Sequence, residues 1–279
     1  MKTTQKSWTA QQIILLLIVI LIAACCFFPV FFSLISAFKT NGEILKDPIG
    51  MPKKLNFANF SYLFKKTNIP QAALNSAMLT VVSCLLIILC VPMSSYVVER
   101  RGGKFRAFFY PFFMAGMMIP FQAYMVPLFK ELRMLHLFGT MIGPILIYIS
   151  GAASFGTLLY CSFIRGVPKE IEESASIDGA KPFATFWHIV FPLLKPCTAS
   201  MLILQGVGIW NDFLMPMMVM PANKPKTINV EIFSFIGEFQ VRYDVLFSGT
   251  FVAIVPVIII FACLQKYFVS GIMSGAVKS

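Results

Sequence analysis

Long apolar runs separated by short polar segments dominate the chain. A helix needs about 20 apolar residues to cross the ~30 Å hydrocarbon core of a bilayer. Stretches of this length cover residues 13–38, 75–98, 108–129, 141–163, 197–220 and 246–269. The third is interrupted by Pro120, Gln122 and Pro127, so we expect a broken span there. The pattern predicts an all-α, polytopic membrane protein with six transmembrane helices, forming a single membrane domain over residues 1–279.

The composition supports this class and excludes two others. Of the 279 residues, 58% are hydrophobic and only 13% are charged, whereas a soluble domain carries about 25% charge. A water-soluble chain of this length could not bury that much apolar surface. The 29 Phe residues argue against disorder. The net charge of +11 would suit a nucleic-acid partner, but the basic residues occur in short clusters between the apolar runs. Loops that face a membrane surface explain them better, and we expect no nucleic-acid partner.

The cysteines and the N-terminal segment each raise an alternative. There are seven cysteines, nearly all of them in apolar stretches, with no CxxC pair and no Cys/His spacing for a metal. We therefore expect neither a disulfide framework nor a metal site. The run ending at Cys25 after two lysines resembles a lipoprotein signal. Because apolar sequence continues to Phe38, we expect an uncleaved membrane helix.

A polar segment between the fourth and fifth runs, residues 165–196, predicts two short helices joined by a turn. Pro168 is a favourable helix start, and the acids that follow it (Glu170, Glu172 and Glu173) suit the positive end of a helix. Asp178-Gly179 predicts the stop, with Gly179 in the left-handed conformation. Pro182 begins a second helix, which Pro192 and Pro196 should break before the fifth span.

The same segment resembles the EAA coupling loop of binding-protein-dependent ABC importer permeases. Glu173-Ser174-Ala175, Gly179, Ile189 and Phe191-Pro192 stand at the family's spacing. Ser174 and Phe191 depart from the usual Ala and Leu but keep small or apolar character. The alternative, an amphipathic linker on the lipid headgroups, would not reproduce this spacing. Lys and Arg near the span ends divide almost evenly between the two sides, so the loop, which must meet a cytoplasmic ATPase, sets the orientation.

The resemblance extends over nearly the whole chain, to the carbohydrate-uptake branch and the second permease of maltose-type importers. The matching pieces are residues 36–40, 75–76, 96–100, 119–120, 127–128, 210–216 and 271–278. It implies the type I ABC importer permease fold, with a core over residues 71–269. It also implies a bacterial plasma (inner) membrane location with both termini in the cytoplasm.

The resemblance further implies the partners of the chain and the residues that meet them. The partners are a second permease subunit in a heterodimer, two cytoplasmic ATP-binding subunits, an extracellular solute-binding protein, a sugar substrate and membrane lipid. No cofactor is implied. The residues implied in ATPase coupling are Glu173, Ser174, Ala175, Ile177, Asp178, Gly179 and Ala180. Glu173 and Asp178 would be the polar anchors, and Ala175 and Gly179 would allow close approach.

The chain carries no motif for chemistry of its own. No P-loop occurs, because Gly102-Gly103-Lys104-Phe105 lacks the spacing and the hydroxyl. The two histidines, His136 and His188, lie in loops far apart, and no acidic pair lies in the apolar runs. We therefore expect a transport subunit without an ATPase site, and a membrane enzyme or channel is the weaker alternative. Within transport, a polyol, sugar phosphate or polyamine remains an alternative substrate.

Trp210, Asn211 and Asp212 are the candidates for the substrate pathway. Asp212 is the acidic residue deep in a predicted span, where a charge costs about 2.5–3.5 kcal/mol. A sugar offers hydroxyls to Asn or Asp and an apolar face to an indole. Equally, Asp212 could cap a broken helix end or pair with a basic residue of a partner subunit. Phe121, Tyr124 and Tyr148 are further candidates for which packing is the favoured role.

Overall fold

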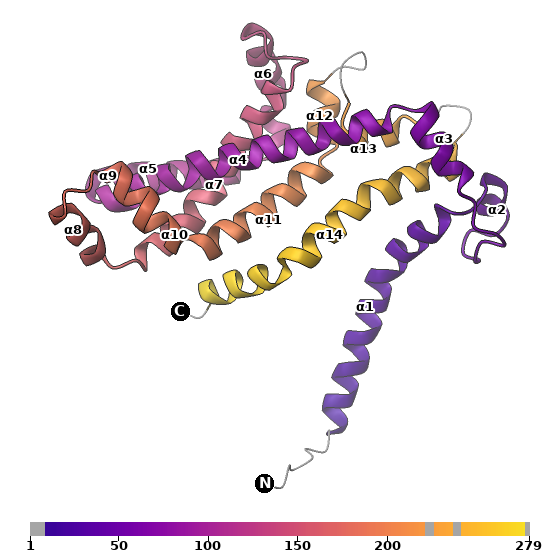
Figure 1. Ribbon diagram of the computed structural model, residues 1–279, viewed down its shortest axis with the longest axis horizontal. Coiled ribbons are helices and arrows are strands. Elements are labelled where there is room, and N and C mark those ends of the chain that lie inside the picture. Colours follow the sequence, from indigo (N-terminus) through magenta and orange to yellow (C-terminus); the bar gives the residue numbers. More distant parts are fainter. Residues whose placement is uncertain (1–8, 221–225, 237–240, 277–279) are drawn as a thin grey trace. The chain divides into compact units, whose positions relative to one another are not determined.

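The computed structural model describes residues 9–220, 226–236 and 241–276, with side chains as far as residue 262 (Figure 1). The described elements are helices, apart from an isolated antiparallel bridge between Ile236 and Val241. The chain divides into two compact units. Residues 1–69 with 232–254 form the first, and residues 70–231 with 255–279 form the second. The all-α class predicted from the sequence is confirmed.

Among the residues that the structure describes, four helices are long and apolar enough to cross a membrane: α1 (Ala10–Ser36), α4 (Ile69–Arg101), α7 (Ile142–Arg165) and, over Tyr243–Ala262, α14 (Tyr243–Ala276). Two bent pairs raise the number to as many as six if each pair is one span. The first pair is α5 (Gly103–Met118) with α6 (Phe121–Met134), bent by 103°. The second joins Pro182–Leu193 to α11 (Lys195–Asn211), bent by 78°.

The break predicted in the third span lies at one of the three expected positions. Ile119 is extended, and Pro120 is the N-cap of α6, as the steric demand of a proline on its preceding residue requires. Gln122 and Pro127, also expected to interrupt the span, lie inside α6. One proline at the junction is therefore enough to turn the chain.

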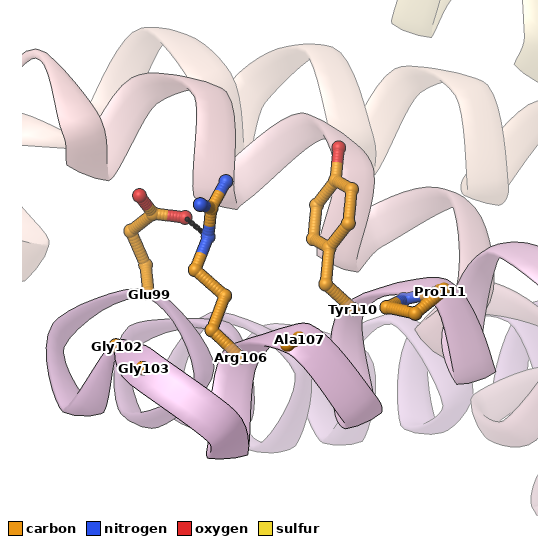
Figure 2. A pocket seen from close by; sticks show the side chains of 7 residues that line it. All are labelled: Glu99, Gly102, Gly103, Arg106, Ala107, Tyr110 and Pro111. Carbon is orange, nitrogen blue, oxygen red and sulfur yellow. Dashed lines mark hydrogen bonds and ion pairs between the residues drawn. The ribbon is translucent and has the colours of Figure 1, made fainter.

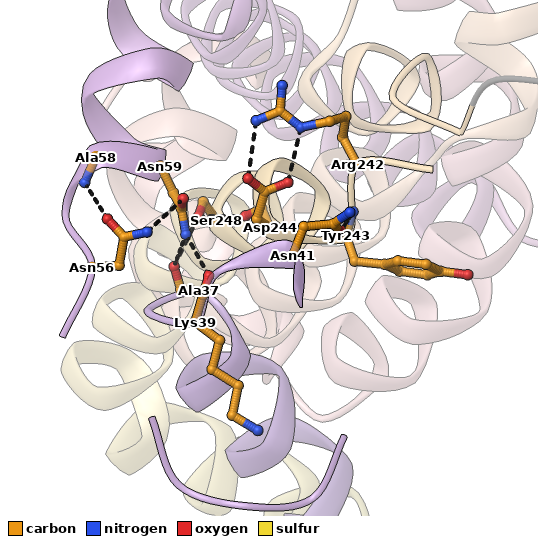
Figure 3. Close-up of polar contacts among 10 residues, drawn as sticks. All are labelled: Ala37, Lys39, Asn41, Asn56, Ala58, Asn59, Arg242, Tyr243, Asp244 and Ser248. Atoms are coloured by element: carbon orange, nitrogen blue, oxygen red, sulfur yellow. Dashed lines mark hydrogen bonds and ion pairs between the residues drawn. The ribbon is translucent and has the colours of Figure 1, made fainter. Parts of the chain in front are cut away.

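The first unit is organised around the turn that follows α1. Helices α2 (Asn41–Lys46) and α3 (Ala58–Lys66) follow this turn. The Asn59 amide donates to the carbonyls of Ala37 and Lys39 at 3.2 and 2.8 Å, and the Ser248 hydroxyl donates to the same Ala37 carbonyl at 2.9 Å (Figure 3). The buried ammonium of Lys39 donates to the carbonyls of Asp47 and Pro48 at 3.1 and 2.9 Å. Asn59 and Ser248 thus satisfy the backbone carbonyls where α1 ends, within residues 36–40 that carry part of the family resemblance.

The core of the second unit lies where α4, α7 and α11 pack together. Val91 of α4 and Met201 of α11 are buried against α7. A Cβ at Gly156 of α7 would overlap a Val91 methyl and lie 2.9 Å from the Met201 methyl. The glycine therefore allows three helices to meet closely, as small residues do in membrane proteins.

Candidate functional site

The predicted coupling loop forms a short helix with a defined stop. Helix α8 spans Lys169–Ile177 with Pro168 at its N-cap. Gly179 has φ +83°, and the N–H groups of Gly179 and Ala180 donate to the carbonyls of Ser176 and Ala175 at 3.1 and 2.9 Å. These two bonds form a Schellman motif. The helix and its left-handed glycine stop are confirmed.

The residues implied in ATPase coupling divide between two faces of α8. Glu173, Ser174, Ile177, Asp178 and Gly179 are exposed, with Ile177 at 86%. Ala180 is half-buried, and Ala175 is only 6% exposed because it lies within the chain's own packing. The exposed residues thus include the branched apolar side chain of Ile177 and the carboxylates of Glu173 and Asp178, while Ala175 serves close approach inside the chain.

Glu172 has a role that the sequence reasoning missed. Its carboxylate lies 2.6 Å from a guanidinium nitrogen of Arg100 at the end of α4, and the Tyr96 hydroxyl donates to it at 2.7 Å. Arg100 also donates to the Val167 carbonyl at 2.8 Å. Arg100 and Glu172 are 72 positions apart in the sequence. The only indication of this ion pair in the sequence is that two polar segments carry opposite charges.

The second part of the loop corrects two expectations. The chain forms α9 (Pro182–Thr185), a π-helical turn η1 (Phe186–Val190) and α10 (Phe191–Leu193) without a break at Pro192. The N–H of Phe191 donates to the carbonyl of Phe186, five residues earlier, in the wider π-helical pattern. This pattern lets the helix continue through Pro192, which has no backbone N–H. The bend falls at Leu194 instead. His188, expected in a loop, lies in η1. In the part of the chain that the structure describes, no group of His, Cys, Asp and Glu could hold a metal.

The predicted fifth span is wrong in its outer end. Helix α11 ends at Asn211, and a separate short helix α12 spans Leu214–Val219. Pro216 accounts for the break, because a continuous helix would leave the Asp212 carbonyl without a donor and against the proline ring.

Asp212 lies at this break with both carboxylate oxygens occupied. One accepts the Met215 N–H at 3.3 Å, and the other accepts the Tyr148 hydroxyl at 3.0 Å. Two residues earlier, the Trp210 carbonyl accepts a hydrogen bond from the Asn229 side-chain amide at 2.9 Å. Asp212 thus serves the start of α12 in the way that a helix-capping residue does.

The aromatic pathway candidates lie around the same break. Phe121 and Tyr148 pack against the cluster of Met215 and Val219, and the Phe121 and Tyr124 rings lie 5.5 Å apart. Asn211 is exposed, whereas Trp210 and Asp212 are half-buried. The structure therefore brings the Asp212 group and two of the aromatic candidates into one neighbourhood.

These features define a polytopic membrane protein that presents a short acidic helix between two of its apolar segments. The chain belongs to the family of binding-protein-dependent transport system inner membrane components, which it matches over residues 90–274. It is a multi-pass membrane transport protein of the ABC permease type.

Individual relatives agree with this family, and a solved structure agrees with the fold. The chain is 33% identical over 250 residues to the probable starch degradation products transport system permease protein AmyC of Thermoanaerobacterium thermosulfurigenes, covering 90% of this chain and 91% of that protein. It is 33% identical over 255 residues to the arabinooligosaccharides transport system permease protein AraQ of Bacillus subtilis (strain 168), covering 90% of each. A chain of a bacterial ABC transporter involved in the import of the acidic polysaccharide alginate matches with a TM-score of 0.83 and 19% identity, over 95% of this chain and all of that one. The last match shows the fold.

Proposed function

We propose that the chain is a permease subunit of an ATP-driven importer and forms half of the pathway for a sugar or oligosaccharide. The observation that carries this proposal is the outer face of α8, where Ile177 is 86% exposed and Glu173 and Asp178 are exposed as well. The names of three relatives assign them to the transport or import of starch degradation products (as probable), of arabinooligosaccharides, and of melibiose, raffinose and stachyose. Import of oligosaccharides is therefore favoured over import of a polyol, sugar phosphate or polyamine.

The partners of this subunit follow from the proposed role. Two cytoplasmic ATP-binding subunits would hydrolyse ATP, a second permease would complete the pathway, and an extracellular solute-binding protein would deliver the sugar. A matched structure of an alginate transporter is described in complex with a periplasmic protein bound to an alginate pentasaccharide, which supports a binding-protein partner. Closure of the ATPase subunits would move α8 and drive alternating access by rigid-body motion.

The proposed topology places residues 165–196 and both termini in the cytoplasm of a bacterial cell. The single membrane domain would cover residues 1–279, with its pathway-forming core at 71–269. Asp212, with Trp210 and Asn211, would lie near the outer end of the pathway, where it would hold the α11–α12 break or meet the sugar.

Uptake by a strain that lacks the chain tests the substrate class. We expect loss of uptake of labelled α- or β-linked oligosaccharides and its return when the chain is restored. Parallel assays with a polyol, a sugar phosphate and a polyamine serve as controls. Loss of uptake of one of these controls alone, with oligosaccharide uptake intact, would contradict the sugar assignment.

The outer face of α8 is tested by Ile177→Lys, with Lys169→Ala as a control at the other end of the helix. We expect Ile177→Lys to lower both uptake and recovery of the ATPase subunits with the permease. An apolar side chain that is buried by a partner would then have been replaced by a charge. Unchanged recovery and uptake would contradict the coupling assignment.

A further inference from the structure

Two adjacent residues at the end of α4 bind different parts of the second unit. Arg100 binds the coupling segment through the Glu172 carboxylate at 2.6 Å and the Val167 carbonyl at 2.8 Å. The Arg100 and Glu172 side chains are each only 13% exposed. Charge-assisted hydrogen bonds with so little exposure hold a defined geometry better than a surface ion pair does.

Glu99 binds in the other direction, to α5 and α7. One of its oxygens accepts from Arg106 of α5 at 2.9 Å, and the other accepts from Arg165 of α7 at 3.1 Å. The Glu99 side chain is 8% exposed. Figure 2 shows Glu99 and Arg106 side by side. Together with Tyr110 they line a hollow of about 330 Å³. One carboxylate therefore ties together two helices besides its own.

Helix α8 depends on such contacts for its position. It has nine residues, and a helix this short is not stable by itself in water. Glu172 and Glu173 are neighbours in sequence but about 100° apart around the helix. The first is bound to Arg100, and the second is exposed. The helix thus uses one acid for its own chain and leaves the next one for a partner.

We infer that Arg100 and Glu172 are positioning residues that fix α8 on the end of α4, and that Glu99 extends this ionic junction to α5 and α7. A displacement of α8 by a partner then reaches α4, α5 and α7 together instead of being absorbed in the short segment between α7 and α8. The inference rests on the proposed role of α8 as the coupling helix, and it adds the connection between that helix and the membrane segments.

A charge exchange tests the junction in the assembled importer, reconstituted with its ATPase subunits and binding protein. The variants are Arg100→Glu, Glu172→Arg and the double exchange. Arg101→Glu is the control, because Arg101 is an exposed neighbour whose guanidinium lies 5.0 Å from the Phe105 ring centroid. The measurement is the amount of ATP hydrolysed per solute imported, together with recovery of the ATPase subunits. Loss of fold alone would change recovery without changing this ratio in the assembled fraction.

We expect each single variant to raise the ratio about five-fold or more, as loss of a coupling energy does. The double exchange should return it to within about two-fold of the wild type, because opposite charges again face each other. The Arg101→Glu control should stay within the same range. Single variants that match this control, or a normally assembled double exchange as uncoupled as the singles, would overturn the inference.

Glu172→Gln keeps the test decisive if the charge reversals do not assemble. It preserves the shape and one acceptor but removes the charge, so the ratio should rise by less than in the reversals. An unchanged ratio would overturn the inference. The Ile177→Lys variant separates this outcome from failure of the proposed function, because it tests whether α8 meets the ATPase at all.

Discussion

Gly179 holds a backbone conformation that few other residues adopt. Its φ of +83° lies in the left-handed region, and nothing within 4 Å would obstruct an added Cβ. The constraint is therefore conformational and does not come from crowding within the chain. Its N–H group and that of Ala180 close the last turn of α8, so the direction in which the chain leaves the helix depends on this one residue.

Replacement of Gly179 by Val should reduce uptake without preventing membrane insertion. A β-branched residue in the left-handed region costs about 1–2 kcal/mol or more, and the chain would leave α8 in another direction. Gly179→Asn is the matched control, because asparagine adopts this region at little cost. Solute uptake and ATPase recovery are compared at equal membrane abundance. Normal uptake by Gly179→Val would contradict the coupling-loop assignment.

Asp212 and Tyr148 should behave as one unit. Asp212→Asn can keep only one of the two accepted hydrogen bonds, and Tyr148→Phe removes the bond between the two side chains. We expect each variant to lower the thermal unfolding midpoint, and the double variant to add little to the larger single effect. Coupling of about 0.5–3 kcal/mol is usual for residues in contact. Tyr124→Phe is the control, since its hydroxyl has no hydrogen bond among the described residues.

Two substitutions of Asp212, to Asn and to Leu, distinguish a sugar contact from a capping role. A contact with the sugar predicts that Asp212→Asn changes uptake affinity or selectivity at normal yield. A capping role predicts reduced yield with unchanged selectivity in the assembled fraction. Unchanged uptake, selectivity and assembly in Asp212→Leu would exclude both roles.

The sequence predicted helices best where local chemistry determines them. Pro168 and Gly179 bound α8 as expected, and Pro120 breaks the third span. The predicted break at Pro192 is wrong because a π-helical turn accommodates the proline. The hydrogen-bond pattern of that turn cannot be recognised from the sequence. The end of α11 at Asn211 was missed although Pro216, five residues later in the sequence, signals it.

The packing of α7 could not be predicted from the sequence, because two of its glycines look alike and differ in contacts. Gly156 lies against Val91 and Met201, whereas Gly151 has no atom within 4 Å of a built Cβ. Gly156→Ala should lower the thermal unfolding midpoint in detergent, since overpacking costs about 1–3 kcal/mol. Gly151→Ala should leave the midpoint unchanged or raise it. Equal effects of the two changes would contradict the described packing of α4, α7 and α11.

The class of the whole molecule follows from composition, whereas its long-range ion pairs and its substrate do not. A chain with 58% hydrophobic and 13% charged residues can only be accommodated by a membrane. Arg100 and Glu172 belong to segments far apart in the sequence. They form an ion pair because α4 packs against the coupling segment, and the sequence does not show this packing. The sugar is decided by a few polar groups and by partner proteins, so residue patterns alone do not name it.

Labelling of single cysteines tests the proposed topology. The exposed Ser174 in α8 and the exposed Lys54 between α2 and α3 should lie on opposite sides of the membrane if both termini are cytoplasmic, because α1 crosses once before Lys54. Each is changed to Cys in a background in which the native cysteines are replaced by Ala, which suits the buried Cys84, Cys161 and Cys197. An impermeant thiol reagent added to intact cells should label position 54 and should label position 174 only after permeabilisation. Labelling of position 174 from outside, with position 54 protected, would invert the proposed orientation and remove α8 from reach of a cytoplasmic ATPase.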